Sequence, residues 1–143
     1  RTFITHKLVK EPSIATLMPL YAGSIDKERA SEIVKTLKSS KQFWTEFPVP
    51  SVPVSSTWYK ELGYWQGPTW INTNWLIADG LRRYGFDSEA DEIIDKSIDL
   101  ITKNGPYEYF SATSGEPAGA KNFSWTASLI IEMISNKPKE KEA

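Results

Sequence analysis

The sequence has 143 residues, of which 24% are charged, and its formal net charge is -1. This length suits one domain with a sizeable core, and the near-neutral charge excludes an electrostatic footprint for nucleic acid or an anionic membrane. Cysteine is absent, His6 is the only histidine and no apolar run approaches membrane-spanning length, so we expect a cytoplasmic protein with no cofactor, no metal site, and no nucleic-acid or membrane partner.

The first predicted helix covers residues 24–40, and Ser24 or Asp26 can cap its start. Four apolar residues recur on one face at helical spacing: Ala30, Ile33, Val34 and Leu37. Residues 41–63 then hold three prolines within six positions, which excludes a helix. The aromatic residues of this segment argue against disorder, and ordered loops of this length are usually functional.

The second helix is predicted to begin at Pro68, a favoured first-turn residue, and to end at Tyr84, where Gly85 stops it. Asp87 caps a third helix, which is predicted to stop at the "NG" of residues 104–105. The two helices are joined by a short connection, so we expect them to pack as an antiparallel hairpin.

A loop rich in glycine and serine leads to the fourth predicted helix, residues 123–134, which is apolar nearly all round and is therefore expected to be buried. The tail, residues 136–143, is expected to be solvated and flexible. No strand and no tandem repeat is evident. The pattern predicts an all-α fold of two helical hairpins, with the long loops at one set of helix ends, where functional sites usually lie.

The stretch "GYWQGPTWINTNW", residues 63–75, interleaves aromatic rings with amide side chains. Aromatic rings stack on the apolar face of a pyranose, while amides hydrogen-bond to its hydroxyls. Trp65 and Gln66 precede the helix, so we interpret them as ligand contacts. Four further residues are open between ligand contact and helix packing or capping: Trp70, Asn72, Asn74 and Trp75.

The second candidate is Glu108, in "YEYFSATSGEPAG" at residues 107–119. Its aromatic neighbours are expected to desolvate the carboxylate and raise its pKa, which suits a general base near neutral pH. The alternative is an ordinary surface carboxylate in a turn, which is how we interpret Glu116.

Three segments together resemble the C-terminal part of glycoside hydrolase family 63 enzymes, the group of processing α-glucosidase I and mannosylglycerate hydrolase, and more distantly trehalases. They are "PLYAGSIDKERASEIVKTL", "GYWQGPTWINTNWLIADGLRRYGF" and "YEYFSATSGEPAGAKNFSWTASLIIEMI", which cover most of residues 18–135. The resemblance implies part of an (α/α)6 toroid with its active site where the long loops gather. It also implies an inverting mechanism with two carboxylates.

Carried over by the motifs, Glu108 matches the general base, and Tyr64 and Trp65 match the aromatic pair that lines the sugar subsite. Gln66 stands where many members have arginine. The general acid is an aspartate of an upstream motif that this sequence does not contain. The substrate-binding set that we predict from the residues and the resemblance is Tyr64, Trp65, Gln66, Trp70, Asn72, Asn74, Tyr109, Phe123 and Trp125.

We therefore predict that residues 1–143 form one domain, the C-terminal third of an (α/α)6 catalytic domain of an inverting α-glycosidase. The expected partners are an oligosaccharide or small glycoside substrate, and either the remainder of the catalytic domain or a second copy. The alternatives are a non-catalytic carbohydrate-binding or helical interaction module, and a purely structural helical bundle.

Overall fold

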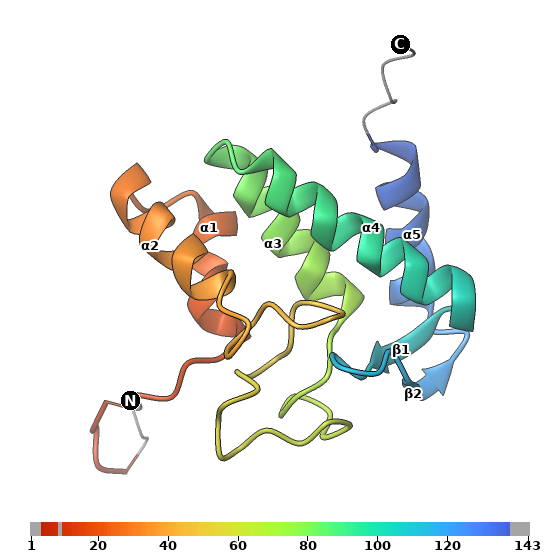
Figure 1. Cartoon of the computed structure of the whole chain (residues 1–143), viewed down its shortest axis with the longest axis horizontal. Helices are drawn as coiled ribbons and strands as arrows, with labels where there is room; N and C mark the ends of the chain where they lie inside the picture. Colours follow the sequence, from red (N-terminus) through yellow and green to blue (C-terminus); the bar gives the residue numbers. More distant parts are fainter. Residues whose placement is uncertain (1–3, 9, 138–143) are drawn as a thin grey trace.

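The centre of the molecule is an antiparallel hairpin of α3 (Ile71–Arg83) and α4 (Asp87–Asn104). The computed structural model describes residues 4–8 and 10–137, and Figure 1 shows this hairpin between α1 and α2 on one side and α5 on the other. Four side chains that are at most 1% exposed form the core of the pair: Ile77, Leu81, Ile93 and Leu100. Burial of these apolar surfaces stabilises the hairpin. The prediction that the second and third helices pack as an antiparallel hairpin is confirmed.

The start of α3 differs from the prediction, because the helix begins at Ile71 and not at Pro68. Thr69 lies in extended backbone and pairs with Pro50 on one side and Phe110 on the other. The backbone groups of Thr69 therefore hydrogen-bond to other segments and are not available to a helix. For this reason α3 starts only after Thr69.

The first helical layer consists of α1 (Met18–Ala22), which follows a 3-10 turn at Ile14–Leu17, and α2 (Lys27–Leu37). Of the two predicted caps of α2, Asp26 is the one used, and its Oδ1 accepts from the Arg29 N–H at 2.8 Å. The short helix α1 was not predicted, because five residues are too few to show a helical period. It packs closely on α3: a Cβ at Gly80 would lie 2.6 Å from the Tyr21 backbone nitrogen.

The helices alternate in direction, so that the long loops gather at one end (Figure 1). The chain enters α1, α3 and α5 (Ser124–Ser135) from this end and leaves α2 and α4 toward it. At the opposite end the connections are short, residues 23–26 and 84–86. The predicted separation of long loops from short connections is confirmed.

Two strands in the loop region contradict the expectation that the chain has none. β1 (Tyr107–Phe110) pairs with β2 (Pro117–Lys121) in an antiparallel hairpin with an irregularity between Tyr107 and Tyr109. These strands are short, and β2 contains Pro117 and Gly119, residues that are depleted in strands. Their pairing arises from tertiary context, which a local sequence pattern does not contain.

The loop of residues 52–66 has a hydrogen-bonded stem. The Ser51 N–H donates to the Pro68 carbonyl at 3.0 Å, and the Gly67 N–H donates to Ser51 Oγ at 2.9 Å. Ser51 and Gly67 are buried. The two ends of the loop are thereby held together beneath the start of α3.

The prediction that the last helix is buried is wrong for α5. Thr126 and Met133 are buried, but Trp125, Ile131 and Ile134 are 51%, 67% and 58% exposed. Among the described residues, α5 contacts α3, α4 and β1, which cover only one side of it. Residues 138–143 of the predicted tail lie outside the described residues. No described helix is both long enough and apolar enough to cross a membrane.

Candidate functional site

Backbone pairing brings the two candidate motifs together. The Thr69 N–H donates to the Phe110 carbonyl at 2.8 Å, and the Phe110 N–H donates to the Thr69 carbonyl at 3.0 Å. Thr69 Oγ1 also donates to the Phe47 carbonyl at 2.6 Å. Residues 63–70 and the strand that carries Glu108 therefore lie side by side, although some forty positions separate them in the sequence.

An aromatic cluster of Tyr64, Trp65, Trp70 and Tyr109 forms at this junction. The Trp70 ring is stacked between Trp65, with centroids 4.0 Å apart, and Tyr109, at 5.1 Å. Tyr64 meets the edges of Trp70 at 5.0 Å and Tyr109 at 5.6 Å. The cluster joins the loop before α3 to strand β1 through ring contacts as well as through the backbone.

Exposure separates the members of the aromatic cluster into two groups. Tyr64 and Trp65 are 50% and 40% exposed, whereas Trp70 is only 2% exposed. The Trp70 Nε1–H donates to the Tyr64 carbonyl at 3.0 Å, so the polar edge of this indole is already paired. Trp70 is therefore a buried ring on which the two exposed rings pack. Of the two interpretations of Trp70, ligand contact and packing, the geometry fits packing.

Glu108 lies on β1 with a half-buried side chain. Its Oε2 accepts a hydrogen bond from the Ala120 N–H of β2 at 3.1 Å. Gly119, at φ +75°, leaves room for this carboxylate, because a Cβ there would lie 2.6 Å from Glu108 Oε2. The hairpin thus holds one carboxylate oxygen, and Glu108 has no ion-pair partner among the described residues.

The candidate amides differ in what they contact. Asn74 is fully buried; its Oδ1 accepts from the Val49 N–H at 3.0 Å, and its Nδ2 donates to the Pro48 carbonyl at 2.8 Å and to Ser97 Oγ at 2.9 Å. These bonds occupy its amide, so we assign Asn74 a structural role in place of the predicted sugar contact. Asn72 is 8% exposed at the start of α3.

The remaining candidate aromatic residues lie on α3, on α5 or at the start of α5. Phe123 is half-buried next to the first turn of α5, and its N–H donates to the Pro106 carbonyl at 2.8 Å. Trp125 is 51% exposed on α5. Trp75 is half-buried on α3 and its ring packs against Tyr21 at 6.2 Å. Within the described residues, none of these three rings contacts the aromatic cluster.

Glu61, two residues before the first motif, connects its loop to the second motif and was not singled out in the sequence. Its Oε1 accepts from Ser111 Oγ at 2.7 Å and from Thr113 Oγ1 at 2.6 Å. These hydrogen bonds, the one from Thr113 foremost, hold the pKa of Glu61 below its usual value. The residues that it contacts are some fifty positions away, so no local sequence pattern indicates the connection.

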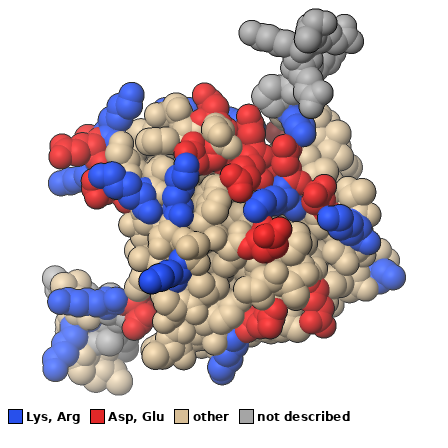
Figure 2. Space-filling view, in the orientation of Figure 1, with Lys and Arg blue, Asp and Glu red and all other residues tan. Residues whose placement is uncertain are grey.

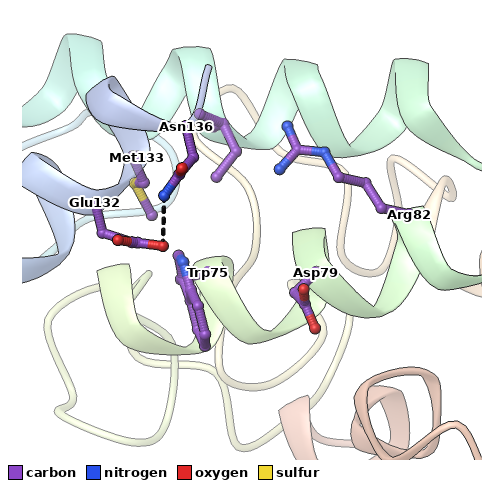
Figure 3. A pocket seen from close by; sticks show the side chains of 7 residues that line it. Trp75, Asp79, Arg82, Glu132, Met133 and Asn136 are labelled. Atoms are coloured by element: carbon purple, nitrogen blue, oxygen red, sulfur yellow. Dashed lines mark hydrogen bonds between the residues drawn. The ribbon is translucent and has the colours of Figure 1, made fainter. Parts of the chain in front are cut away.

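A cavity of about 290 Å³ opens beside the aromatic cluster, and Trp65 and Gln66 line it. Another, of about 300 Å³, lies between α3, α4 and α5 (Figure 3) and is lined by Trp75, Asp79, Arg82, Ile94, Glu132, Met133 and Asn136. Its charged and amide side chains already have partners: Asp79 pairs with Arg83, Arg82 with Asp91, and Asn136 with Glu132. We therefore place the candidate site at the loop end.

The charge distribution agrees with this choice. In Figure 2, charged side chains are densest over the helices, and fewer of them lie over the loop region. Exposed aromatic rings on a sparsely charged surface suit a neutral, partly apolar ligand such as a sugar.

A helical domain whose loops bring exposed aromatic rings next to a strand that carries a carboxylate has features in common with helical glycoside hydrolases. The family model described as mannosylglycerate hydrolase MGH1-like glycoside hydrolase domain matches residues 1–126, and the chain belongs to this family. The resemblance to glycoside hydrolase family 63 is confirmed.

Individual relatives agree. The chain is 34% identical over 129 residues to a mannosylglycerate hydrolase from Rubrobacter radiotolerans, covering 88% of this chain and 29% of that protein. The crystal structure of the GH63 mannosylglycerate hydrolase from Thermus thermophilus in complex with glucose superposes with a TM-score of 0.81 at 31% identity, covering 87% of this chain and 32% of the other. Neutral trehalase Nth1 from Saccharomyces cerevisiae, at 21% identity and a TM-score of 0.74, shares the fold, with 97% of this chain and 26% of that chain covered. This chain thus spans less than a third of these proteins.

Proposed function

We propose that this chain supplies the general base and part of the sugar site of an inverting α-glycosidase. The observation that carries the proposal is the Thr69–Phe110 pairing, which sets the exposed rings of Tyr64 and Trp65 beside the strand of Glu108. A sugar ring stacked on these rings would therefore lie near a carboxylate held by its own hairpin.

In the proposed reaction, Glu108 takes a proton from a water molecule, and the oxygen of that water attacks the anomeric carbon. The bond from this carbon to the leaving oxygen breaks, and a second carboxylic acid protonates that oxygen. Inversion requires the two carboxyl groups to be roughly 6.5–9.5 Å apart, because the water must fit between Glu108 and the sugar. Gln66 would bond to a sugar hydroxyl as a neutral donor and acceptor, in place of the arginine of many relatives.

We propose that the second carboxylic acid and the rest of an (α/α)6 toroid come from protein outside these residues. The alternating helix directions, with α1, α3 and α5 entering from the loop end, are those of successive hairpins in such a toroid. The exposed apolar side of α5, with Ile131 and Ile134, would then be covered by another hairpin of the catalytic domain.

The names of the relatives suggest the substrate. Two of the three cited above are mannosylglycerate hydrolases, and one solved structure of the Thermus enzyme holds Tris and D-glycerate. We propose an α-glycoside, either a small one such as a glycosylglycerate or an oligosaccharide. The alternative, a carbohydrate-binding module without turnover, keeps the exposed rings but makes no use of Glu108.

The test is Glu108→Gln in a complete catalytic domain that contains this chain, assayed with mannosylglycerate. We expect kcat to fall by about 10²–10⁴-fold with little change in substrate affinity, because general base catalysis is lost while the rings remain. The first product observed by NMR in the unsubstituted enzyme should be the inverted anomer.

The matched control is Glu116→Gln, which neutralises an exposed carboxylate in the same loop and is expected to leave kcat unchanged. Near-normal turnover in the Glu108 variant, or equal losses in both variants, would refute the assignment of the base. Sugar binding without turnover in any complete domain would favour the binding module.

A further inference from the structure

The cavity beside the aromatic cluster is one part of a longer groove, and the reaction proposed above uses only its Trp65 and Gln66 lining. Its first part, of about 290 Å³, is lined by Glu11, Trp58, Trp65 and Gln66 together with smaller residues. A second part, of about 260 Å³, shares Glu11, Pro12 and Ser56 with the first and continues to Gln42. Each part lies near the lower limit of ordinary small-molecule pockets, so each has room for a ligand about the size of one sugar ring.

Two indole rings give the groove its apolar surface. Trp58 is 56% exposed and Trp65 is 40% exposed. One face of Trp65 is covered by Trp70, which lies parallel to it at 4.0 Å, so the exposed surface of Trp65 belongs to its other face and its edge. Exposed aromatic surface that lines a cavity is what binds the C–H face of a pyranose.

Polar groups lie at the same cavity. Ser56 Oγ donates to Glu11 Oε2 at 3.4 Å and accepts from the Trp58 N–H at 3.1 Å, so it connects the carboxylate to the Trp58 backbone. A carboxylate accepts hydroxyl hydrogens, and the amide of Gln66 both donates and accepts. Among the described residues that line the two parts, none is lysine or arginine. The groove therefore suits a neutral polyhydroxylated ligand better than an anion.

We propose that this groove is a second sugar subsite that takes the next pyranose ring of an oligosaccharide, beside the ring that contacts Tyr64 and Trp65. The inference rests on the proposed function, because Trp65 and Gln66, which line the groove, are also the proposed contacts of the first ring. Trp58 is then a residue that selects for chain length, since it contacts the second ring and not the first.

The test uses the 143-residue chain labelled with ¹⁵N, in which the indole N–H signals report on each tryptophan. Maltotriose and α-mannotriose are compared with methyl α-D-glucopyranoside and methyl α-D-mannopyranoside. We expect at least one trisaccharide to shift the signals of Trp58 and Trp65, and its matching monosaccharide to shift that of Trp65 alone. Trp44 and Trp75 line neither part of the groove, so their signals should stay in place.

Variants make the test quantitative. Trp58→Ala is expected to weaken trisaccharide binding roughly tenfold and monosaccharide binding less than twofold, because one stacking surface is lost. Trp58→Phe, which keeps a ring, should restore affinity to within about threefold of the unsubstituted chain. Leu62→Ala is the matched control, because Leu62 is an exposed apolar residue of the same loop that does not line the groove.

The outcomes separate this subsite from the function on which it rests. If trisaccharides shift Trp65 but not Trp58, or if Trp58→Ala and Trp58→Phe both bind them normally, the second subsite is refuted and the first stands. Equal losses for monosaccharide and trisaccharide also refute it, because Trp58 would then act on the first ring. If no sugar shifts any indole signal at 100-fold excess or more, the second subsite is refuted, while the proposed base is decided separately by Glu108→Gln in the complete domain.

Discussion

Gly119 is the position at which a single methyl group should displace the proposed base. A Cβ there would lie 2.6 Å from Glu108 Oε2, 2.7 Å from Glu108 Cβ and 2.8 Å from Tyr109 Cε1. Carbon atoms in good contact are about 3.5–4.0 Å apart, so in Gly119→Ala these groups must move by about 1 Å. Because Glu108 Cβ cannot swing away as a side-chain tip can, we expect β1 and β2 to separate.

The loss in free energy of unfolding expected for Gly119→Ala has two parts. Gly119 has φ +75°, and a left-handed conformation costs a non-glycine residue about 1–2 kcal/mol. Inserting a methyl group into occupied space costs about 1–3 kcal/mol more. Gly85→Ala isolates the first part, because Gly85 has φ +82° and a Cβ there would meet nothing within 4 Å. The difference between the two variants should therefore be about 1–3 kcal/mol.

Urea unfolding of the 143-residue chain measures both losses. In a complete catalytic domain, a base displaced by about 1 Å should lower kcat on the order of 100-fold, and Gly85→Ala should keep normal turnover. Equal unfolding free energies for the two variants, together with normal turnover in Gly119→Ala, would refute the close approach of Gly119 to Glu108.

Two further predictions concern residues that hold the loops in place. Asn74→Ala should lower the free energy of unfolding by about 3 kcal/mol in urea titrations, because it leaves the buried partners of its amide unpaired; Asn72→Ala should cost less than about 1 kcal/mol, and equal costs would contradict the structural role of Asn74. The hydrogen bonds to Glu61 lower its pKa, so the stability they contribute is fully present above its usual pKa of 4.5 and is lost as the pH falls through the lowered value. The unfolding free energy of the unsubstituted chain should therefore exceed that of Glu61→Gln at pH 7 and converge on it in acid, whereas a difference that does not change with pH would contradict this.

Local signals predicted α2, α3, α4 and α5, although the expected Asp87 cap is wrong: Asp87 is the first residue of α4, and its N-cap, Phe86, makes no side-chain cap hydrogen bond. The α3–α4 hairpin follows from apolar periodicity and from Gly85, and the Asp26 cap was one of two candidates. The start of α3 was misplaced, because Thr69 is held by Pro50 and Phe110, which are distant in the sequence. The strands were missed for the same reason: their pairing depends on contacts that no window of the sequence contains.

The candidate site was predictable in its chemistry but not in its geometry. Residue type alone indicated Trp65 and Glu108, and the family resemblance added Tyr64 and gave each residue a role. Neither residue type nor the resemblance indicated that the amide of Asn74 is hydrogen-bonded to the backbone of Pro48 and Val49. The apolar residues on all sides of α5 predicted that the helix is buried. The described residues cover only one side of it, so the prediction fails for the other side.

The stem beneath the 52–66 loop has a consequence for how substrate preference can change. Ser51, Gly67 and Pro68 close this loop at its base, while Thr69 separately fastens the strand of Glu108. Compact loops with joined ends behave as self-contained units. The tip of this loop, with Trp58, can therefore be exchanged, lengthened or shortened while the stem stays closed. Glu61 and Tyr64 of the same loop contact the β1–β2 hairpin through Thr113 and Tyr109, so a change at these two positions also reaches the hairpin that carries Glu108. Under the proposed function, recognition at the tip is then free to diversify, while Glu61 and Tyr64 tie the rest of the loop to the proposed base.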